Sequence, residues 1–249
     1  MAGQPEMSFW DHLDVLRGTL FRSVLAVFLL SLVFLGAKTF LFDIVLGPSR
    51  PDFFLYRQLG LDFDMQLVNI DVSAQFFVHL KMSVLCGVVV GFPYVVYELW
   101  KFIAPALYES EKKAVRGAFT LSSLLFYLGI AVGYCVVLPV CLVFFMNYSV
   151  SDSIVNTISL NSYVSMFISM VFLIGLVFEF PTVAVILSRL GILTRPMLKK
   201  SRRYAVVGIL ILAAVITPSD PVSMVVLALP LYALYEFSIL LCRGKTEKQ

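Results

Sequence analysis

The sequence predicts an all-α integral membrane protein whose six transmembrane helices leave both termini on the cytoplasmic side. Of its 249 residues, 60% are hydrophobic and only 14% are charged, and the mean hydropathy is +0.92. A soluble domain carries about 25% charged residues, so this composition exceeds what a soluble core can bury. Long apolar runs also alternate with short basic segments along the chain. Together these observations predict a bundle of spanning helices that lipid surrounds.

Four apolar runs are long enough to cross a bilayer, because a hydrocarbon core of about 30 Å needs about 20 helical residues. They cover residues 20–42, 74–98, 117–145 and 163–188. The third would reach about 43 Å as a helix, so it must tilt, kink at Pro139 or project beyond the membrane. The first is longer than the apolar region of a cleavable signal peptide, and we expect it to remain in the protein.

The last two predicted helices, residues 204–217 and 222–241, are short. The sequence TPSDP at 217–221 separates them and is a strong turn signal. The second of the two contains Pro230 and Glu236. The pair forms either two short spans under a locally thinned bilayer or a re-entrant hairpin. Both alternatives return the chain to the side that it left.

The distribution of lysine and arginine predicts the orientation, since basic residues gather in cytoplasmic segments. With the N-terminus inside, fifteen of the 19 basic residues fall in inner segments, and the outer segment 146–161 has none. The exceptions are Lys38, Arg50, Arg57 and Lys81. We therefore expect an N-in/C-in protein in which residues 1–249 form a single transmembrane domain.

The first outer loop, residues 43–72, is too long and too apolar to be an ordinary linker. Aromatic and aliphatic side chains are interleaved there with Asp52, Asp62 and Asp64. Loops of this length inside a compact protein are usually functional or carry their own structure. We expect short amphipathic helices packed as a cap over the outer ends of the spans.

The sequence contains no motif that indicates catalysis or nucleotide binding, since HExxH, GxSxG and Walker A patterns are absent. The two histidines, His12 and His79, are far apart in the predicted topology and make a poor metal site. We therefore predict no enzymatic activity and no cofactor, and an intramembrane protease lacks a catalytic set. The cysteines lie in apolar runs without a CxxC pair, which is typical of small core side chains: Cys86, Cys135, Cys141 and Cys242.

Glu179 is the candidate polar site within the membrane, because it interrupts the fourth apolar run in the sequence GLVFEFP. A charged residue near a helix centre costs on the order of 3 kcal/mol on insertion scales and usually faces an interior or a cavity. One interpretation is a polar or protonatable site that meets a substrate or a partner. The other is a neutral glutamic acid that holds two helices together by hydrogen bonds. The sequence favours the functional interpretation.

Charged clusters also mark the predicted inner surface. Acids at Asp14, Glu109 and Glu111 are unusual there, and they either bind a cationic ligand or pair locally with neighbouring bases. Composition supports both readings equally. The basic stretch from Arg195 to Arg203 is better explained as an orientation signal that contacts anionic lipid headgroups than as a specific site.

Residues 97–113, YELWKFIAPALYESEKK, resemble the best-known signature of TatC, the receptor subunit of the twin-arginine protein translocase. From the order of further matching fragments within six predicted spans, the chain is identified as a member of the TatC family. These fragments are HLDVLR at 12–17, Pro48, FP at 92–93, FYLG at 126–129, FEFP at 178–181, KSRRY at 200–204, TPSDP at 217–221 and LPLYALYE at 229–236.

The resemblance implies a protein of the bacterial cytoplasmic (inner) membrane that recognises twin-arginine signal peptides at the cytoplasmic surface. Such receptors assemble with single-span TatA or TatB subunits and with further copies of themselves. Folded proteins then cross the membrane at the expense of the proton-motive force, and no nucleic acid takes part. The family's signal-peptide surface maps here onto Arg17, Phe102 and Glu111, with Asp14 and Glu109 as further candidates. The resemblance also maps the family's intramembrane glutamate onto Glu179.

Structural or assembly roles are expected at Pro48, Pro93, Asp220 and Met224. Two positions, Val15 and Met224, depart from the family pattern. Many relatives carry an acid where this chain has Val15, and Asp14 lies about 100° away around a helix. Relatives often have a glutamine where this chain has Met224, so a polar contact to a partner helix is absent or supplied elsewhere.

A small secondary transporter or ion channel is the alternative function. It would also explain an intramembrane acid without nucleotide motifs. Such proteins tend to show internal repeats and several ionisable groups at the midplane. This sequence shows one central acid and no repeat.

Overall fold

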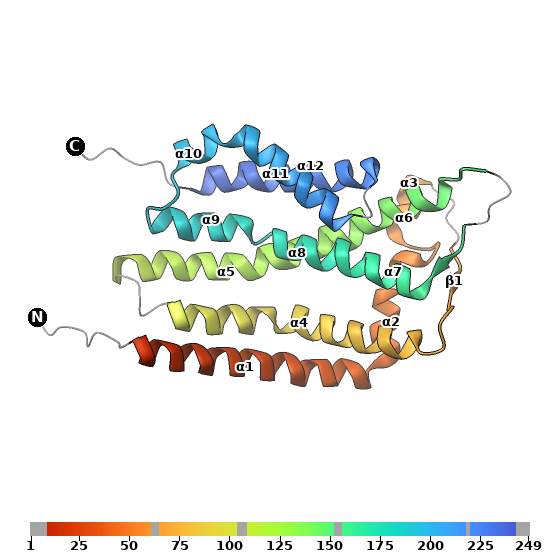
Figure 1. The fold of residues 1–249 in the computed structure, drawn as a ribbon, viewed down its shortest axis with the longest axis horizontal. Coiled ribbons are helices and arrows are strands. Elements are labelled where there is room, and N and C mark those ends of the chain that lie inside the picture. Colours follow the sequence, from red (N-terminus) through yellow and green to blue (C-terminus); the bar gives the residue numbers. More distant parts are fainter. Residues whose placement is uncertain (1–8, 61–64, 104–108, 152–155, 218–219, 243–249) are drawn as a thin grey trace, which may run out of the picture.

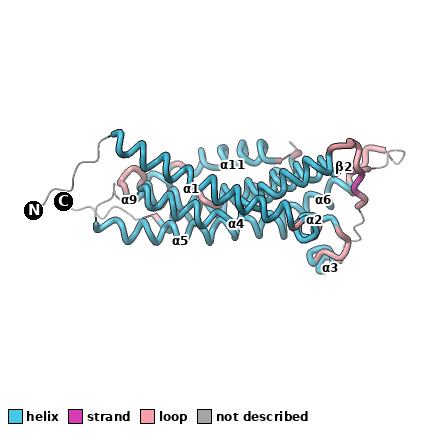
Figure 2. Tube along the Cα trace, turned by 90° about the horizontal axis from the view of Figure 1, so that it is seen from below, coloured by secondary structure: helices cyan, strands magenta, loops and turns pink. Residues whose placement is uncertain are grey.

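The protein is an elongated bundle of helices that run roughly along its longest axis (Figures 1 and 2). The computed structural model describes residues 9–60, 65–103, 109–151, 156–217 and 220–242. Within that part of the chain, five helical segments are long and apolar enough to cross a membrane. They are Leu13–Gly36, Ala74–Ile103, Phe119–Asn147, Leu160–Arg189 and Pro221–Leu241.

Helices α1 (Phe9–Gly36) and α4 (Ala74–Ile103) pack side by side along most of their length. Gly87 permits this approach, because a Cβ added there would collide with the Ser31 side chain and lie 2.8 Å from the Ser31 nitrogen. The predicted span 20–42 is wrong beyond residue 36, since the chain breaks at Ala37 and begins a separate helix, α2 (Lys38–Val45). Apolar composition continues across that break and conceals it.

Helix α5 (Glu109–Val132) continues through a wider π-helical turn, η3 (Gly133–Val137), into α6 (Leu138–Asn147). Proline has no N–H to donate and its ring crowds the preceding turn, so the wide turn just before Pro139 accommodates it within a continuous helix. The predicted span 117–145 lies within this continuous helix, which begins earlier than predicted, at Glu109, and ends at Asn147.

The fourth span consists of α7 (Leu160–Phe167), the π-helical turn η4 (Ile168–Phe172), α8 (Leu173–Val177) and α9 (Phe180–Arg189). The two π-helical turns face each other at a close crossing. A Cβ added to Gly133 would lie 2.5 Å from the Met170 carbonyl oxygen, so a side chain at residue 133 does not fit. The predicted helical span 163–188 is confirmed, with an interruption at residues 178–179.

The chain ends with α10 (Arg195–Lys200), α11 (Arg202–Ile216) and α12 (Pro221–Leu241). The 15 residues of α11 extend about 22 Å, less than the bilayer core, so the prediction of a short fifth helix is confirmed. The predicted bounds of the sixth helix, 222–241, agree with α12 to one residue, but its 21 residues extend about 32 Å, so the description of this helix as short is wrong. Pro230 lies inside α12 without ending it.

The segment after α2 forms a cap over one end of the bundle, as the sequence predicts. It contains η1 (Gly47–Ser49), α3 (Phe54–Leu59) and β1 (Leu67–Val68), and β1 pairs in parallel with β2 (Ile158–Ser159). Tyrosine hydroxyls fix the turn that leads into the cap. They donate to backbone carbonyl oxygens in the pairs Tyr134–Ile44 at 2.7 Å, Tyr163–Val45 at 2.6 Å and Tyr56–Pro48 at 2.7 Å.

Pro48 is buried within this cap as the second residue of the 3₁₀ turn η1, and its carbonyl oxygen accepts the hydrogen bond from Tyr56. Tyr56 is buried as well, and burial raises the pKa of its phenol, so the hydroxyl keeps the proton that it donates. The expected structural role of Pro48 therefore has a physical basis in this contact.

Candidate functional site

The helix ends that carry the predicted signal-peptide residues lie together at one end of the bundle (Figure 1). Asp14 and Arg17 are exposed on the first turns of α1, and Phe102 is half-buried near the end of α4. Glu109 and Glu111 begin α5, but their side chains fall outside the described residues. The fold thus brings the three helix ends to one surface, and any contact with either glutamate stays a prediction.

A buried ion pair joins α1 to α4 close to this surface. The Arg22 guanidinium donates through Nε to Glu98 Oε2 at 2.8 Å, and Lys101 Nζ lies 3.6 Å from Glu98 Oε1. The Glu98 side chain is 2% exposed, whereas that of Arg22 is 49% exposed. The carboxylate is therefore shielded from water and balanced by two cations, while the guanidinium keeps contact with the surroundings.

The Arg22–Glu98 pair is not predicted above, where Arg22 counts only among the basic residues of the inner segments. A usable signal was present nonetheless. Arg22 lies near the start of the first apolar run and Glu98 near the end of the second. Consecutive spans run in opposite directions, so two such positions lie at the same depth.

A groove of about 510 Å³ opens between α4 and α5 beside the ion pair. Pro93 lines it, which gives this proline a place at the candidate site rather than only within a helix. Lys101 lies over the Tyr97 ring, 4.7 Å from its centroid, in a cation–π contact. The remaining lining residues are Val96, Trp100, Phe119, Thr120 and Ser123.

Glu179 lies between α8 and α9, at the interruption of the fourth span. The Ser122 hydroxyl on α5 donates to Glu179 Oε2 at 2.6 Å. Within the described residues, Glu179 Oε1 and Thr182 Oγ1 are buried and have no hydrogen-bond partner. Unpaired buried oxygens in an apolar surrounding cost free energy, and the neighbouring Thr182 side chain interacts with the Glu179 carboxyl, so a small movement that brings the two together would satisfy both atoms.

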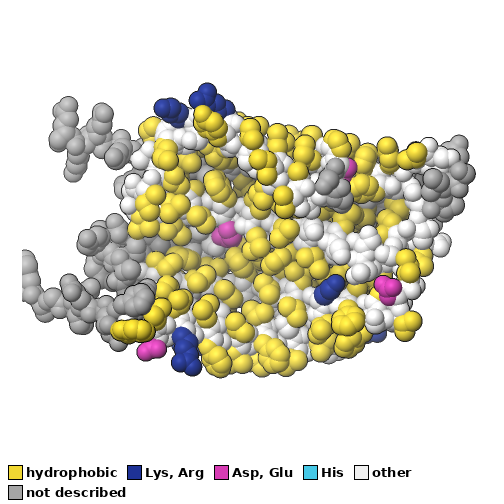
Figure 3. Space-filling view, in the orientation of Figure 1, with side chains coloured by type: hydrophobic (Ala, Val, Ile, Leu, Met, Phe, Trp, Pro, Cys, Tyr) yellow, Lys and Arg dark blue, Asp and Glu magenta, His cyan; other side chains and the backbone are white. Residues whose placement is uncertain are grey.

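The space-filling view shows how apolar this surface is. Hydrophobic side chains cover most of the face in Figure 3, and one acidic side chain interrupts its middle. Lysine and arginine appear in this view near α10, and further basic side chains lie along the lower edge and toward the opposite end. A polar group at mid-depth, flanked by apolar surface and a basic end, can bind a ligand that is itself largely apolar.

Asp220 is a helix cap rather than an open binding residue. Its Oδ2 accepts from the Ser223 backbone N–H at 2.7 Å, which satisfies a free donor at the start of α12. Its other oxygen, Oδ1, is buried without a partner in the part of the chain that is described. Met224, on the next turn, is half-buried and packs against the main core. Both residues thus contribute to structure at this end of α12.

The described residues contain no cluster of histidine, cysteine and acidic side chains that could hold a metal ion. All of the cysteines are unpaired, and Cys141 and Cys242 are buried among apolar side chains.

This chain is similar to proteins of one translocase family. The family model for the Sec-independent protein translocase protein (TatC) matches residues 11–230. TatC of Blattabacterium sp. subsp. Periplaneta americana is 34% identical, over 94% of each chain. TatC of Escherichia coli K12 is 34% identical, over 93% of this chain and 86% of its own. The crystal structure of the twin-arginine translocase receptor TatC in DDM superposes with a TM-score of 0.79 at 30% identity, covering 93% of this chain and 99% of that one.

Proposed function

Because the chain belongs to the TatC family of Sec-independent protein translocase proteins, we propose that it is the receptor subunit of a twin-arginine translocation system. It binds twin-arginine signal peptides at the cytoplasmic face of the inner membrane. It then assembles with single-span TatA or TatB subunits and with further copies of itself. Folded precursor proteins cross the membrane at the expense of the proton-motive force.

The observation that carries this proposal is the convergence of the ends of α1, α4 and α5 on one surface. Glu109 and Glu111 begin α5, at the same end of the bundle as the start of α1, where Asp14 is exposed. The described carboxylate of Glu98 already accepts from Arg22, so it is not free for a ligand. Glu111 is therefore the leading partner for the signal guanidinium groups, because carboxylates bind arginine in charge-assisted pairs.

The apolar part of the signal peptide has a surface to follow from this end. The groove between α4 and α5 begins near Lys101 and reaches Ser123. Ser122, the neighbouring residue, holds Glu179 on another face of α5. A peptide that lies along α5 thus passes from the charged end toward the half-satisfied carboxyl of Glu179.

The proposed topology has six spans, with both termini in the cytoplasm and residues 1–249 as one domain. The helices supporting it are the five long segments together with α11, which is too short to cross a bilayer of ordinary thickness. A local thinning of about 8 Å would match its length of about 22 Å to the bilayer.

Export of a reporter fused to a twin-arginine signal tests the assignment. We expect Glu111→Ala and Glu111→Lys to abolish export while the protein still inserts into the membrane. Glu236→Gln is the matched control, since Glu236 lies on the same side and pairs with Arg202 outside the proposed surface. Normal export by both Glu111 variants would overturn the role of this residue. Solute uptake by the purified protein in liposomes would instead favour a transporter.

A further inference from the structure

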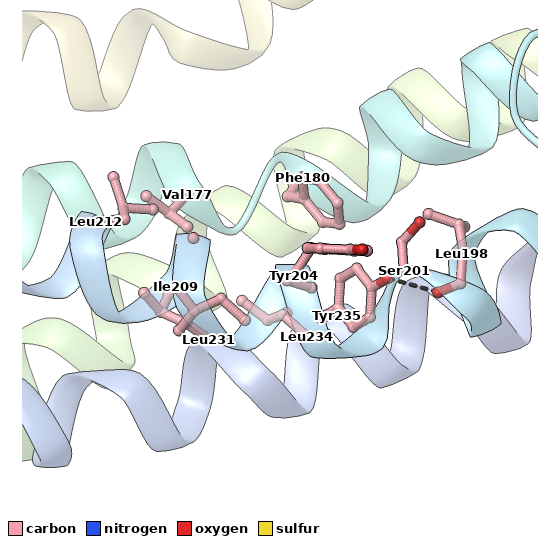
Figure 4. Close-up of a pocket in the computed structure, with 12 residues that line it drawn as sticks. Val177, Phe180, Leu198, Ser201, Tyr204, Ile209, Leu212, Leu231, Leu234 and Tyr235 are labelled. Atoms are coloured by element: carbon pink, nitrogen blue, oxygen red, sulfur yellow. Dashed lines mark hydrogen bonds between the residues drawn. The ribbon is translucent and has the colours of Figure 1, made fainter.

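A second groove, separate from the one between α4 and α5, lies where α8 to α12 meet (Figure 4). Its volume is about 430 Å³, and apolar side chains form nearly all of its wall. Ser201 and Tyr204 lie at one end of the lining and Leu212 at the other. The remaining lining residues are Val177, Phe180, Leu198, Ala205, Gly208, Ile209, Leu231, Leu234 and Tyr235.

The length of the groove matches one leaflet of a membrane. Its lining along α11 runs from Ser201 to Leu212, a helical rise of about 16 Å. Half of a hydrocarbon core of about 30 Å is about 15 Å. A lipid acyl chain has this length, whereas a partner helix that crosses the membrane needs a contact surface about twice as long.

The end of the groove nearest α10 is basic. The Arg203 guanidinium lies 4.8 Å from the centroid of the Tyr204 ring and donates to the Tyr204 hydroxyl at 3.0 Å, so it sits beside a lining residue. Lys200 is exposed next to Ser201, which also lines the groove. Arg202, by contrast, donates to Glu236 at 2.7 Å and is largely neutralised. Lys200 and Arg203 therefore leave an excess of positive charge at the mouth.

We propose that this groove binds one anionic phospholipid from the leaflet on the basic side of the protein. An acyl chain occupies the apolar slot, and the phosphodiester lies between Lys200 and Arg203. Each basic residue near an anionic membrane surface contributes about 1 kcal/mol, or about a factor of five in affinity. The two together give about a 25-fold preference for an anionic over a zwitterionic headgroup with the same chains.

Gly208 offers a way to close the groove without disturbing the fold. It lines the slot on α11, and a Cβ added there would meet no atom within 4 Å. A leucine side chain at this position therefore fills the space reserved for the acyl chain. Gly36 is the matched control, since a Cβ added there also meets nothing within 4 Å and it lies outside the groove.

The test is native mass spectrometry of the purified full-length protein with added phosphatidylglycerol or phosphatidylcholine of identical chains. We expect the wild type to retain one phosphatidylglycerol in preference to phosphatidylcholine. Lys200→Gln combined with Arg203→Gln should lower that preference about 25-fold. Gly208→Leu should reduce the retention of both lipids. Gly36→Leu, and Lys38→Gln combined with Lys81→Gln, should leave retention unchanged.

Three results would overturn the proposal. The first is equal retention of the two lipids by the wild type, which removes the role of Lys200 and Arg203. The second is unchanged phosphatidylglycerol retention in Gly208→Leu, which places the lipid elsewhere. The third is a Gly208→Leu protein that keeps its lipid but loses co-purification of a single-span partner subunit, which assigns the groove to a protein.

Discussion

Two acidic side chains within the spans are stabilised in different ways, and the difference bears on what each does. Glu98 accepts from Arg22 and lies near Lys101, so its negative charge is balanced. Glu179 accepts one hydrogen bond from Ser122, and its second oxygen has no partner in the described part of the chain. The first arrangement fixes two helices in place, and the second leaves capacity for a ligand or partner.

Replacing Arg22 by alanine should destabilise the protein by about 1–2 kcal/mol. The buried Glu98 carboxylate loses its closest cation, although Lys101 remains nearby and the half-exposed guanidinium already shares its charge with the surroundings. The midpoint of thermal unfolding in detergent measures the change. Arg57→Ala is the control for an exposed arginine on the cap. The exchanged pair Arg22→Glu with Glu98→Arg should recover part of the loss, and no recovery would argue against a direct pairing.

For Glu179, glutamine and leucine should behave differently. Glutamine keeps an oxygen that can accept from Ser122, so we expect Glu179→Gln to export a twin-arginine reporter close to the wild-type rate. Leucine leaves the buried Ser122 hydroxyl without its acceptor, which costs about 1–3 kcal/mol, and export should fall. Equal loss in both variants would show that ionisation of the carboxyl matters.

At the scale of elements, the crossing of η3 with η4 brings the third and fourth spans together more closely than side chains normally allow. Glycine provides the space on both sides. A Cβ added to Gly129 would lie 2.9 Å from the Gly175 Cα, and one added to Gly133 would lie 2.9 Å from the Val171 Cα. Small residues at helix contacts inside membranes allow such packing, since van der Waals contact is a main source of helix association there.

Gly133→Ala should therefore destabilise the protein by about 1–3 kcal/mol, the usual cost of overpacking. Gly36→Ala and Gly117→Ala are matched controls in helices, because a Cβ at either position meets no atom within 4 Å. These should leave stability unchanged or raise it by about 0.4–1 kcal/mol. Chemical unfolding of the three variants side by side measures the difference, and a loss shared by all three would remove the packing explanation.

The sequence predicts where the spanning helices lie better than it predicts the breaks within them. Apolar runs and the turn at TPSDP placed four of the five long spans close to their observed positions, whereas the first was predicted about six residues too late. The break at Ala37 went undetected because Phe40, Leu41 and Phe42 continue the apolar pattern. The partner of Glu98 went undetected for another reason, since pairing with Arg22 depends on the rotation of one helix about its axis.

At the scale of the whole molecule, the helices differ in how closely their lengths match the thickness of a bilayer's hydrocarbon core. α12 extends about 32 Å and α11 about 22 Å, although the two are consecutive and packed together. Length and composition therefore identify five spanning helices among the described residues, and charge distribution supplies the argument for the sixth.

Cysteine accessibility checks that the fourth span, Leu160–Arg189, crosses the membrane. In a variant without native cysteines, Val150→Cys should react with a membrane-impermeant reagent in intact cells, because this exposed residue follows the third span. Met197→Cys, exposed on α10, should react only after the membrane is opened. Phe126→Cys, fully buried, is the control that should not react in either condition. Reaction of residues 150 and 197 from the same side would contradict a fourth span that crosses the membrane.

The Arg22–Glu98 pair also has a consequence for biosynthesis. α1 leaves the ribosome before α4, so Arg22 reaches the membrane without its carboxylate, and its long side chain can extend to water meanwhile. Glu98 arrives later and is sealed from water in the finished bundle, where its side chain is 2% exposed. The free-energy cost of burying the Glu98 carboxylate in the membrane is small only beside a helix that already carries a guanidinium group. We therefore expect α1 to be in the membrane before α4 packs against it, so that the Glu98 carboxylate meets the Arg22 guanidinium as it leaves water.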